Sequence, residues 1–231
     1  MTRGGESTPA RGAIARPTAW TVVIPVKAPA GAKTRLAAAV SPAEREALAR
    51  AFALDTIAAV LAARSVVRVV VVGDDPSLAG GAEFLAEPAD GPRGLGPAIA
   101  YGIAHARAGD EEAGFRPVAV LLGDLPALAP EELDAALEGA SRHPLAFVRD
   151  ADGTGTTLAT AAEGVHLAPH FGIDSAARHA AAGFVELEAS ARLRRDVDTI
   201  EALVEAVSLG VGPNTRAAAA RIPLRGGAGA P

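Results

Sequence analysis

The chain of 231 residues has no cysteine, and this excludes disulfide bonds, thiolate metal sites and a cysteine nucleophile. Aromatic residues make up only 3% of the sequence, which disfavours nucleic-acid-binding modules that stack bases on exposed rings. The formal net charge of -5 gives no global positive field that would attract nucleic acid. A bound anion must therefore meet a local group of cations, and we expect no nucleic-acid partner.

Long hydrophobic runs are also lacking. The longest ones, residues 69–72 and 118–122, are far shorter than the roughly 18 residues of a membrane-spanning helix. Residues 1–19 are rich in Gly, Pro, Arg and Ala and lack the apolar centre of a secretory signal. We therefore expect a cytoplasmic protein without a membrane partner.

The composition suggests one domain between two loose ends. With 49% apolar residues, the chain is long enough for one sizeable core. Both ends of the sequence are dense in Gly, Pro, Ala and Arg, which is typical of chain termini without a packed core. We predict a disordered leader over residues 1–19, a single domain over residues 20–212 and a flexible tail over residues 213–231.

Strand-like and helix-like segments alternate along the domain. We expect strands at 21–26, 65–73, 82–87, 117–123, 144–149, 156–161 and 184–188, and helices at 42–63, 95–108, 130–140, 174–182 and 199–209. Ser41 and Pro42 are suited to the N-cap and first position of the first helix. Alternation of this kind predicts an α/β fold, with a mixed, mostly parallel sheet and helices on both faces. The turn signal at Asp152 and Gly153 predicts a two-residue hairpin and hence an antiparallel strand.

Three cations follow the first predicted strand. Lys27, Lys33 and Arg35 lie within nine residues that contain no acid. Ligands of open α/β sheets bind beyond the carboxyl ends of the strands, so these cations are candidates for holding the phosphates of a nucleotide. The spacing is not that of a P-loop, and a solvated basic loop explains the cluster equally well.

Two further groups follow strands in the first half of the domain. Gly94 and Gly96 would let the backbone pass close to a nucleoside, although the third glycine of a dinucleotide-binding loop is missing. Asp124 stands at the end of the strand in 117–123, where a carboxylate can hold a magnesium ion that bridges phosphates. A plain loop before a helix and a turn aspartate are the alternatives for the two groups.

Hydroxyl groups gather after the predicted hairpin turn. Thr154, Thr156 and Thr157 form a row that the turn itself does not explain. Because side chains alternate along a strand, Thr156 and Thr157 would point to opposite faces, and only one of them can enter a given site. We choose Thr157 as the candidate ligand-binding residue.

A helix start near residue 174 offers a second anion site. Gly172 and Ser175 flank this start, where unpaired N–H groups and the helix dipole favour a carboxylate or phosphate. Ordinary capping by Asp174 or Ser175 is the alternative. The spacings of the histidines match no zinc motif, so His166, His170 and His179 are interpreted as surface or supporting groups.

Asp198 is the last candidate carboxylate. It begins the sequence D-T-I-E, which reads as a capping box with Glu201 at the third helical position. A carboxylate has two oxygens, so one oxygen can cap the helix while the other reaches a metal ion.

Taken in order, these segments resemble a known enzyme family. The cationic loop, GDLPAL, DADGTGTT, FGIDSAARH and RRDVDT resemble the guanylyltransferases that act on 2-phospho-L-lactate or phosphoenolpyruvate in the biosynthesis of coenzyme F-420. The resemblance covers about residues 20–212. Its most specific parts are DADGTGTT, FG-x-x-S and VDT, whereas the opening loop and GDLP recur across nucleotidyltransferases.

The resemblance carries implications for fold, substrates and site. It implies a nucleotide-diphospho-sugar-transferase-like, Rossmann-like fold, with GTP as substrate and Mg²⁺ as cofactor, and a homodimer would agree with the family. It also implies that Thr157, Gly172 and Ser175 match the positions that hold the phosphorylated acid. Relatives often carry a polar residue where this sequence has Gly96.

The expected reaction is a direct attack of the acceptor's phosphate oxygen on the α-phosphorus of GTP, with release of pyrophosphate. A phosphate monoester is already an anion, so alignment and charge neutralisation are enough. Asp124 and Asp198 would hold magnesium, and Lys27, Lys33 and Arg35 would offset the charge of the leaving pyrophosphate.

Alternatives remain for both the class and the acceptor. A nucleotidyltransferase for another small phosphate, such as a sugar, molybdopterin or isoprenoid precursor, would not need the hydroxyls of Thr157 and Ser175. A noncatalytic GTP-binding module would release no pyrophosphate. Among acceptors, phosphoenolpyruvate, 2-phospholactate and 3-phosphoglycerate all place a carboxylate beside a phosphate. We favour phosphoenolpyruvate, because the Ala-, Arg- and Gly-rich composition resembles that of bacterial members expected to use it.

Overall fold

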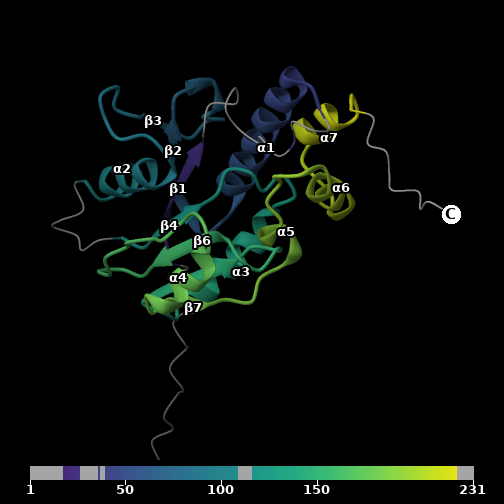
Figure 1. The fold of residues 1–231 in the computed structure, drawn as a ribbon. Helices are drawn as coiled ribbons and strands as arrows, with labels where there is room; N and C mark the ends of the chain where they lie inside the picture. The colour runs from purple at the N-terminus through teal and green to yellow at the C-terminus, as the bar shows by residue number, and fades with distance from the viewer. Residues whose placement is uncertain (1–17, 27–35, 37–39, 109–115, 223–231) are drawn as a thin grey trace, which may run out of the picture.

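A seven-stranded sheet with helices on both faces organises the protein (Figure 1). In this computed structural model, residues 18–26, 36, 40–108 and 116–222 are described. The strand order is β3-β2-β1-β4-β6-β5-β7. The predicted single-domain α/β fold is thereby confirmed.

The elements follow the predicted alternation closely. The strands are β1 (Trp20–Val26), β2 (Val66–Gly73), β3 (Glu83–Ala86), β4 (Val118–Leu121), β5 (Leu145–Arg149), β6 (Thr156–Ala161) and β7 (Val185–Glu186). The helices are α1 (Pro42–Ala62), α2 (Leu95–Arg107), α3 (Pro130–Ala140), α4 (Ser175–Ala181), α5 (Ala191–Arg194), α6 (Ile200–Leu209) and α7 (Pro213–Ala219), with a 3-10 turn η3 (Pro76–Leu78). The short elements η3, α5 and α7 were not predicted.

Strand direction decides which residues meet at one edge. Strand β6 is antiparallel to both of its neighbours, β4 and β5, while all other strand pairs are parallel. The antiparallel strand predicted from the turn signal is therefore present. As a result, the start of β6 lies at the same edge of the sheet as the carboxyl ends of β1, β2, β4 and β5.

The two faces of the sheet bury separate cores. In β1, Ile24 packs in the core that α1 and α3 cover, whereas Val23 packs in the core under α2. Helix α2 lies so close to the sheet that a Cβ at Gly102 would come within 2.5 Å of Val23 Cγ1 and 2.7 Å of Val72 Cγ2. Only glycine fits at that position, and this close approach fixes α2 over the centre of the parallel strands.

The first helix begins as predicted. Ser41 is its N-cap: its hydroxyl accepts a hydrogen bond from Glu44 N, and the Glu44 carboxylate accepts one from Ser41 N at 2.8 Å. This capping box satisfies two N–H groups that a helix start otherwise leaves unpaired. Of the described helices, none is long and apolar enough to cross a membrane.

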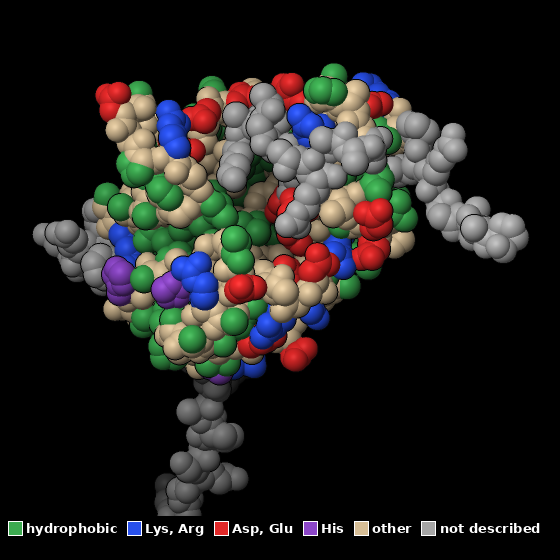
Figure 2. Space-filling view, in the orientation of Figure 1, with side chains coloured by type: hydrophobic (Ala, Val, Ile, Leu, Met, Phe, Trp, Pro, Cys, Tyr) green, Lys and Arg blue, Asp and Glu red, His purple; other side chains and the backbone are tan. Residues whose placement is uncertain are grey.

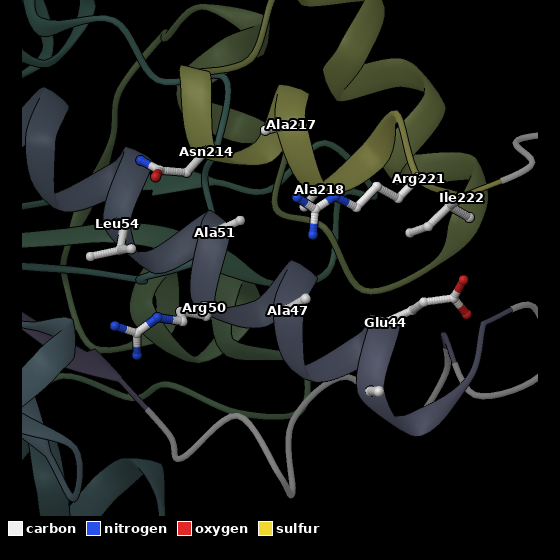
Figure 3. Close-up of a pocket in the computed structure, with 11 residues that line it drawn as sticks. Glu44, Ala47, Arg50, Ala51, Leu54, Asn214, Ala217, Ala218, Arg221 and Ile222 are labelled. Atoms are coloured by element: carbon white, nitrogen blue, oxygen red, sulfur yellow. The ribbon is translucent and has the colours of Figure 1, made fainter.

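The flexible tail predicted from residue 213 is wrong for residues 213–222, which form α7 and its end. The buried Asp55 carboxylate of α1 accepts hydrogen bonds from Asn214 N and Nδ2 and from Thr215 N, at 2.7–3.1 Å. A Cβ at Gly212 would lie 2.4 Å from the Asp55 carboxyl carbon, so the chain turns tightly over this group. The groove between α1 and α7 is lined by alanines of both helices and by polar side chains that include Glu44, Arg50 and Arg221 (Figure 3). Residues 1–17 of the predicted leader and residues 223–231 lie outside the described part of the chain.

Candidate functional site

The candidate residues of the described chain gather along the edge where the parallel strands end. Asp124 follows β4, Thr157 is at the start of β6, and Asp198 precedes α6. The space-filling view shows a hollow at the centre of the molecule, with acidic side chains beside it (Figure 2). The three predicted cations, Lys27, Lys33 and Arg35, lie outside the described residues.

Two carboxylate-bearing segments are joined directly at this edge. The backbone N–H of Val197 donates a hydrogen bond of 3.1 Å to the backbone carbonyl of Asp124. Asp198 is the next residue after Val197, so its segment lies against the end of β4. The structure thus joins the two segments that carry Asp124 and Asp198, the residues that the sequence predicts to share a metal ion.

The capping role predicted for Asp198 is wrong. Thr199 is the N-cap of α6, and its hydroxyl accepts from Ala202 N at 3.2 Å. Glu201 is accordingly the second helical residue and does not close a capping box. Because Thr199 performs the capping, Asp198 is not required for it, and the metal role does not compete with the helix start.

The connection between β5 and β6 is longer than the two-residue turn that was predicted. It runs over residues 150–155 and is organised by Asp150, whose side chain is buried. The Asp150 carboxylate accepts hydrogen bonds from Thr154 N at 3.0 Å and from Gly155 N at 2.7 Å. A Cβ at Gly155 would collide with this carboxylate, which explains the second glycine of DADGTGT.

The hydroxyls of the two adjacent threonines at the start of β6, Thr156 and Thr157, have different environments. Thr156 Oγ1 lies 3.0 Å from His179 Nδ1, so this hydroxyl is occupied within the protein. Thr157 is fully buried, and its hydroxyl has no hydrogen-bond partner among the residues that the structure describes. A buried hydroxyl without a partner costs free energy, and a bound ligand would offset that cost.

A strand irregularity sets the position of Thr157. Val148 pairs with Leu158 and Arg149 pairs with Thr156, so the pairing of β5 with β6 skips Thr157. The simple alternation used in the prediction does not apply at such a bulge. On the other side of β6, Leu122 N donates to Thr157 O at 3.0 Å, which brings Thr157 next to the strand end that leads to Asp124.

His179 was interpreted as a surface or supporting group, but its side chain is completely buried. Its Nδ1 also lies 2.8 Å from the carbonyl of Ser175, and its Nε2 accepts from His170 N at 2.9 Å. The neutral ring with a proton on Nδ1 satisfies both contacts. Burial lowers the pKa of His179 to about 4, since the charged ring would lose its hydration among Phe147, Phe171 and Phe184.

The predicted anion site at the start of α4 differs in detail from the expectation. Ser175 N donates to Gly172 O at 3.2 Å, and Ala176 N donates to Thr154 O at 3.1 Å. These two N–H groups are therefore already bonded within the protein, and Asp174 makes no capping bond with its side chain. Gly172 has φ +113°, a conformation that favours glycine, and a Cβ there would meet open space.

Gly94 and Gly96 lie at the start of α2. Gly94 is the N-cap residue with φ +121°, so the backbone itself requires glycine at this position. Gly96 is in the first turn, and within the described chain no atom beyond its chain neighbours and the backbone of its own helix lies within 4 Å of the place where its Cβ would be. The first turn of α2 is consequently open to an approaching group.

A groove runs from Gly96 along α2. It has a volume of about 630 Å³, and the facing wall is the segment 166–171. Its other lining residues are Ile99, Ala100, Ile103, Ala104, Arg107 and Arg178. The ionisable residues of this lining are arginines and histidines, without a carboxylate, so the groove suits an anion with an apolar part.

The chain was compared with known proteins. A family model described as guanylyl transferase CofC like matches residues 20–217. A phosphoenolpyruvate guanylyltransferase from Streptomyces coelicolor is 49% identical over 214 residues, which cover 90% of this chain and 99% of the relative. A protein of the same name from Thermomonospora curvata is 48% identical over 211 residues, covering 88% of this chain and 90% of the relative.

Solved structures show the same fold at low sequence identity. A crystal structure from Desulfovibrio desulfuricans, described as a nucleotide-diphospho-sugar transferase, superposes with a TM-score of 0.55 at 19% identity, covering 78% of this chain and 83% of that one. A 4-diphosphocytidyl-2C-methyl-D-erythritol synthase from Anaerococcus prevotii gives a TM-score of 0.50 at 12% identity, covering 84% of this chain and 98% of that one. The nucleotide-diphospho-sugar-transferase-like fold predicted from the sequence is confirmed.

The buried His179 predicts a loss of stability in mild acid. In the unfolded chain a histidine takes up a proton near its ordinary pKa of 6.5, whereas folded His179 does so only near about 4. Between these values the unfolded state binds more protons, so the free energy of unfolding should fall by about 2 kcal/mol from pH 7 to pH 5. Urea denaturation at the two pH values measures this change.

His179→Gln is the matched control for that measurement. The variant should be less stable at pH 7, because it loses ring packing, but its stability should change far less between pH 7 and pH 5. An equal fall in both proteins would show that other groups cause the acid sensitivity.

Proposed function

Since the chain belongs to the guanylyl transferase CofC-like family, we propose that it transfers GMP from GTP to the phosphate of phosphoenolpyruvate. The products would be pyrophosphate and enolpyruvoyl-2-diphospho-5'-guanosine, a precursor in coenzyme F-420 biosynthesis. The observation that carries the proposal is the identity of 48–49% with phosphoenolpyruvate guanylyltransferases over about nine tenths of the chain. 2-Phospho-L-lactate is the second candidate acceptor, with lactyl-2-diphospho-5'-guanosine as its product.

The reaction needs no covalent intermediate on the protein. A phosphate oxygen of the acceptor attacks the α-phosphorus of GTP, a new P–O bond forms, and the bond to the bridging oxygen of the β-phosphate breaks. The electron pair leaves with pyrophosphate. Because the attacking oxygen is already anionic, the protein contributes alignment and charge neutralisation rather than a general base.

We propose that Asp124 and Asp198 would hold a magnesium ion at the sheet edge. Asp124 and Asp198 offer hard carboxylate oxygens on segments that a backbone hydrogen bond joins. Within the described residues there is no group of three or more His, Cys, Asp or Glu that could hold a metal. Two carboxylates agree with magnesium, which is usually bound by one or two carboxylates together with substrate phosphates and water. When bound, the ion would neutralise charge on the reacting phosphates.

The remaining predicted contacts belong to the two substrates. Gly94 and Gly96 leave the first turn of α2 open for the nucleotide, and Lys27, Lys33 and Arg35 would neutralise its β- and γ-phosphates. For the acceptor we propose the hydroxyls of Thr157 and Ser175 and the exposed backbone at Gly172. The cationic lining of the neighbouring groove supports an anionic acceptor. A homodimer and a cytoplasmic location stay predictions.

The proposal is tested with purified protein, magnesium, each nucleoside triphosphate and a panel of three acids. Pyrophosphate release and product mass should identify GTP with phosphoenolpyruvate as the best pair, ahead of 2-phospholactate and 3-phosphoglycerate. Faster turnover with another acid would reassign the acceptor. Tight GTP binding without pyrophosphate release for any acceptor would favour the noncatalytic module.

Substitutions at the adjacent residues Thr156 and Thr157 are expected to have opposite effects on stability and on acceptor binding. Thr157→Val removes a buried hydroxyl without a described partner, so the fold should be unchanged or up to about 1 kcal/mol more stable. The KM for the acceptor should nevertheless rise, by about tenfold for one lost hydrogen bond of roughly 1.4 kcal/mol, while the KM for GTP stays constant.

Thr156→Val is the control at the adjacent position. It removes the hydrogen bond with His179, so it should lower the free energy of unfolding by about 1 kcal/mol and leave the acceptor KM unchanged. Kinetics and urea denaturation of both variants provide the comparison. An acceptor KM that responds to Thr156 and not to Thr157 would contradict the assignment.

A further inference from the structure

We propose that Arg194 is a positioning residue, whose guanidinium holds the turn over residues 150–155, here called the acceptor turn because it leads into Thr157, in register with the loop that carries Asp198. The inference rests on the proposed function and deepens it, because it explains how the acceptor side of the site is aligned with the metal side. The sequence gives no local signal for this contact, because Arg194 and Asp150 lie 44 positions apart.

Arg194 contacts the turn at three points. Its Nε donates to the carbonyl of Arg149 at 3.1 Å, and its Nη2 donates to the carbonyl of Asp150 at 3.1 Å. In return, the backbone carbonyl of Arg194 accepts from Ala151 N at 2.8 Å. Side chain and backbone of one residue therefore fix three consecutive residues, at the place where β5 ends and the turn begins.

The turn that Arg194 contacts also fixes the position of the proposed acceptor residues. The Asp150 carboxylate binds Thr154 N and Gly155 N, and the chain then enters β6 at Thr156 and Thr157. The carbonyl of Thr154 accepts from Ala176 N, the residue after Ser175. Both proposed acceptor hydroxyls thus depend on a turn whose first residues Arg194 holds.

The other end of the connection is the metal side. Arg194 is the last residue of α5, and Val197, three residues later, donates to the carbonyl of Asp124. Arg195 adds an ion pair of 2.8 Å to Asp152 within the same turn. The short segment 194–198 is therefore bonded to the acceptor turn at its start and to the end of β4 near its finish.

The geometry requires arginine rather than any cation. Two neighbouring carbonyls point at two different nitrogens of one planar group, which a guanidinium can satisfy in a single orientation. A lysine ammonium is a single point donor on a flexible stem, so it would keep the charge and lose the alignment. Small misplacements of reacting groups cost rate and affinity steeply, up to about 100-fold for about 1 Å.

The test compares Arg194→Gln, Arg194→Lys and the control Arg192→Gln in the full chain. Arg192 lies on the same helix and makes an ion pair of 4.0 Å with Glu132, so the control matches in charge change and location. Arg194→Gln should raise the KM for phosphoenolpyruvate about tenfold or more and leave the KM for GTP within about twofold. Arg194→Lys should show the same split, and Arg192→Gln should resemble the unaltered protein.

Several results would overturn the inference. Full rescue by lysine would mean that charge alone matters. Equal rises in the KM for GTP and for phosphoenolpyruvate, together with a lower melting temperature, would reduce Arg194 to a general stabiliser. An acceptor KM in Arg194→Gln equal to that of Arg192→Gln would remove the role altogether.

Amide hydrogen exchange separates this inference from the proposed function. Thr154 N–H and Gly155 N–H should exchange faster in Arg194→Gln than in Arg192→Gln, whatever reaction the protein catalyses. If the unaltered protein releases no pyrophosphate, the proposed function fails while the exchange result still tests the connection. Unchanged exchange in an active protein would overturn the inference and leave the function intact.

Discussion

The candidate site depends on the backbone hydrogen bond from Val197 N to the carbonyl of Asp124. It fastens the loop before α6 to the end of β4 and so brings the segments of two carboxylates to one point on the sheet edge. Like-charged groups repel one another at close range, and their approach must be enforced by the fold or offset by a cation. Here the fold joins the two segments, and we propose that a divalent ion bound with a triphosphate offsets the repulsion between their carboxylates.

On the acceptor side, some polar groups are hydrogen-bonded within the protein and others are left for a ligand. Asp150, Thr156 and His179 satisfy one another or the backbone and build a rigid, buried support. Thr157 stands among these groups with a buried hydroxyl that finds no partner in the described part of the chain. An enzyme that binds a small phosphorylated acid needs a few fixed hydrogen-bonding groups without a partner in the protein. A ligand that cannot pair with them leaves them unsatisfied and therefore binds more weakly than the correct acid.

Much of the fold, and the sheet edge at which the candidate residues lie, could be predicted, whereas the roles of those residues stay predictions. Ser41, Pro42 and Glu44 signal a helix start locally, and the β-branched runs of β1 and β2 signal buried parallel strands. The unpredicted features depend on partners distant in sequence. Asp55 accepts hydrogen bonds from the start of α7, Arg194 donates to the turn after β5, and a bulge changes the pairing of Thr157. None of these features produces a periodic pattern in the sequence. The prediction of the N-cap of α6 was wrong by one position, because Asp198 and Thr199 are adjacent and both are good N-cap residues.

The account depends on Asp124 and Asp198 serving one magnesium ion, and a double-variant cycle tests this most directly. Pyrophosphate release from GTP and phosphoenolpyruvate should fall by about 100- to 1,000-fold in Asp124→Asn and in Asp198→Asn, with a higher magnesium requirement. Because two ligands of one ion act as a unit, the double variant should be little worse than either single variant. Fully multiplicative losses, or near-normal turnover in either single variant, would contradict the shared ion and with it the proposed geometry of the site.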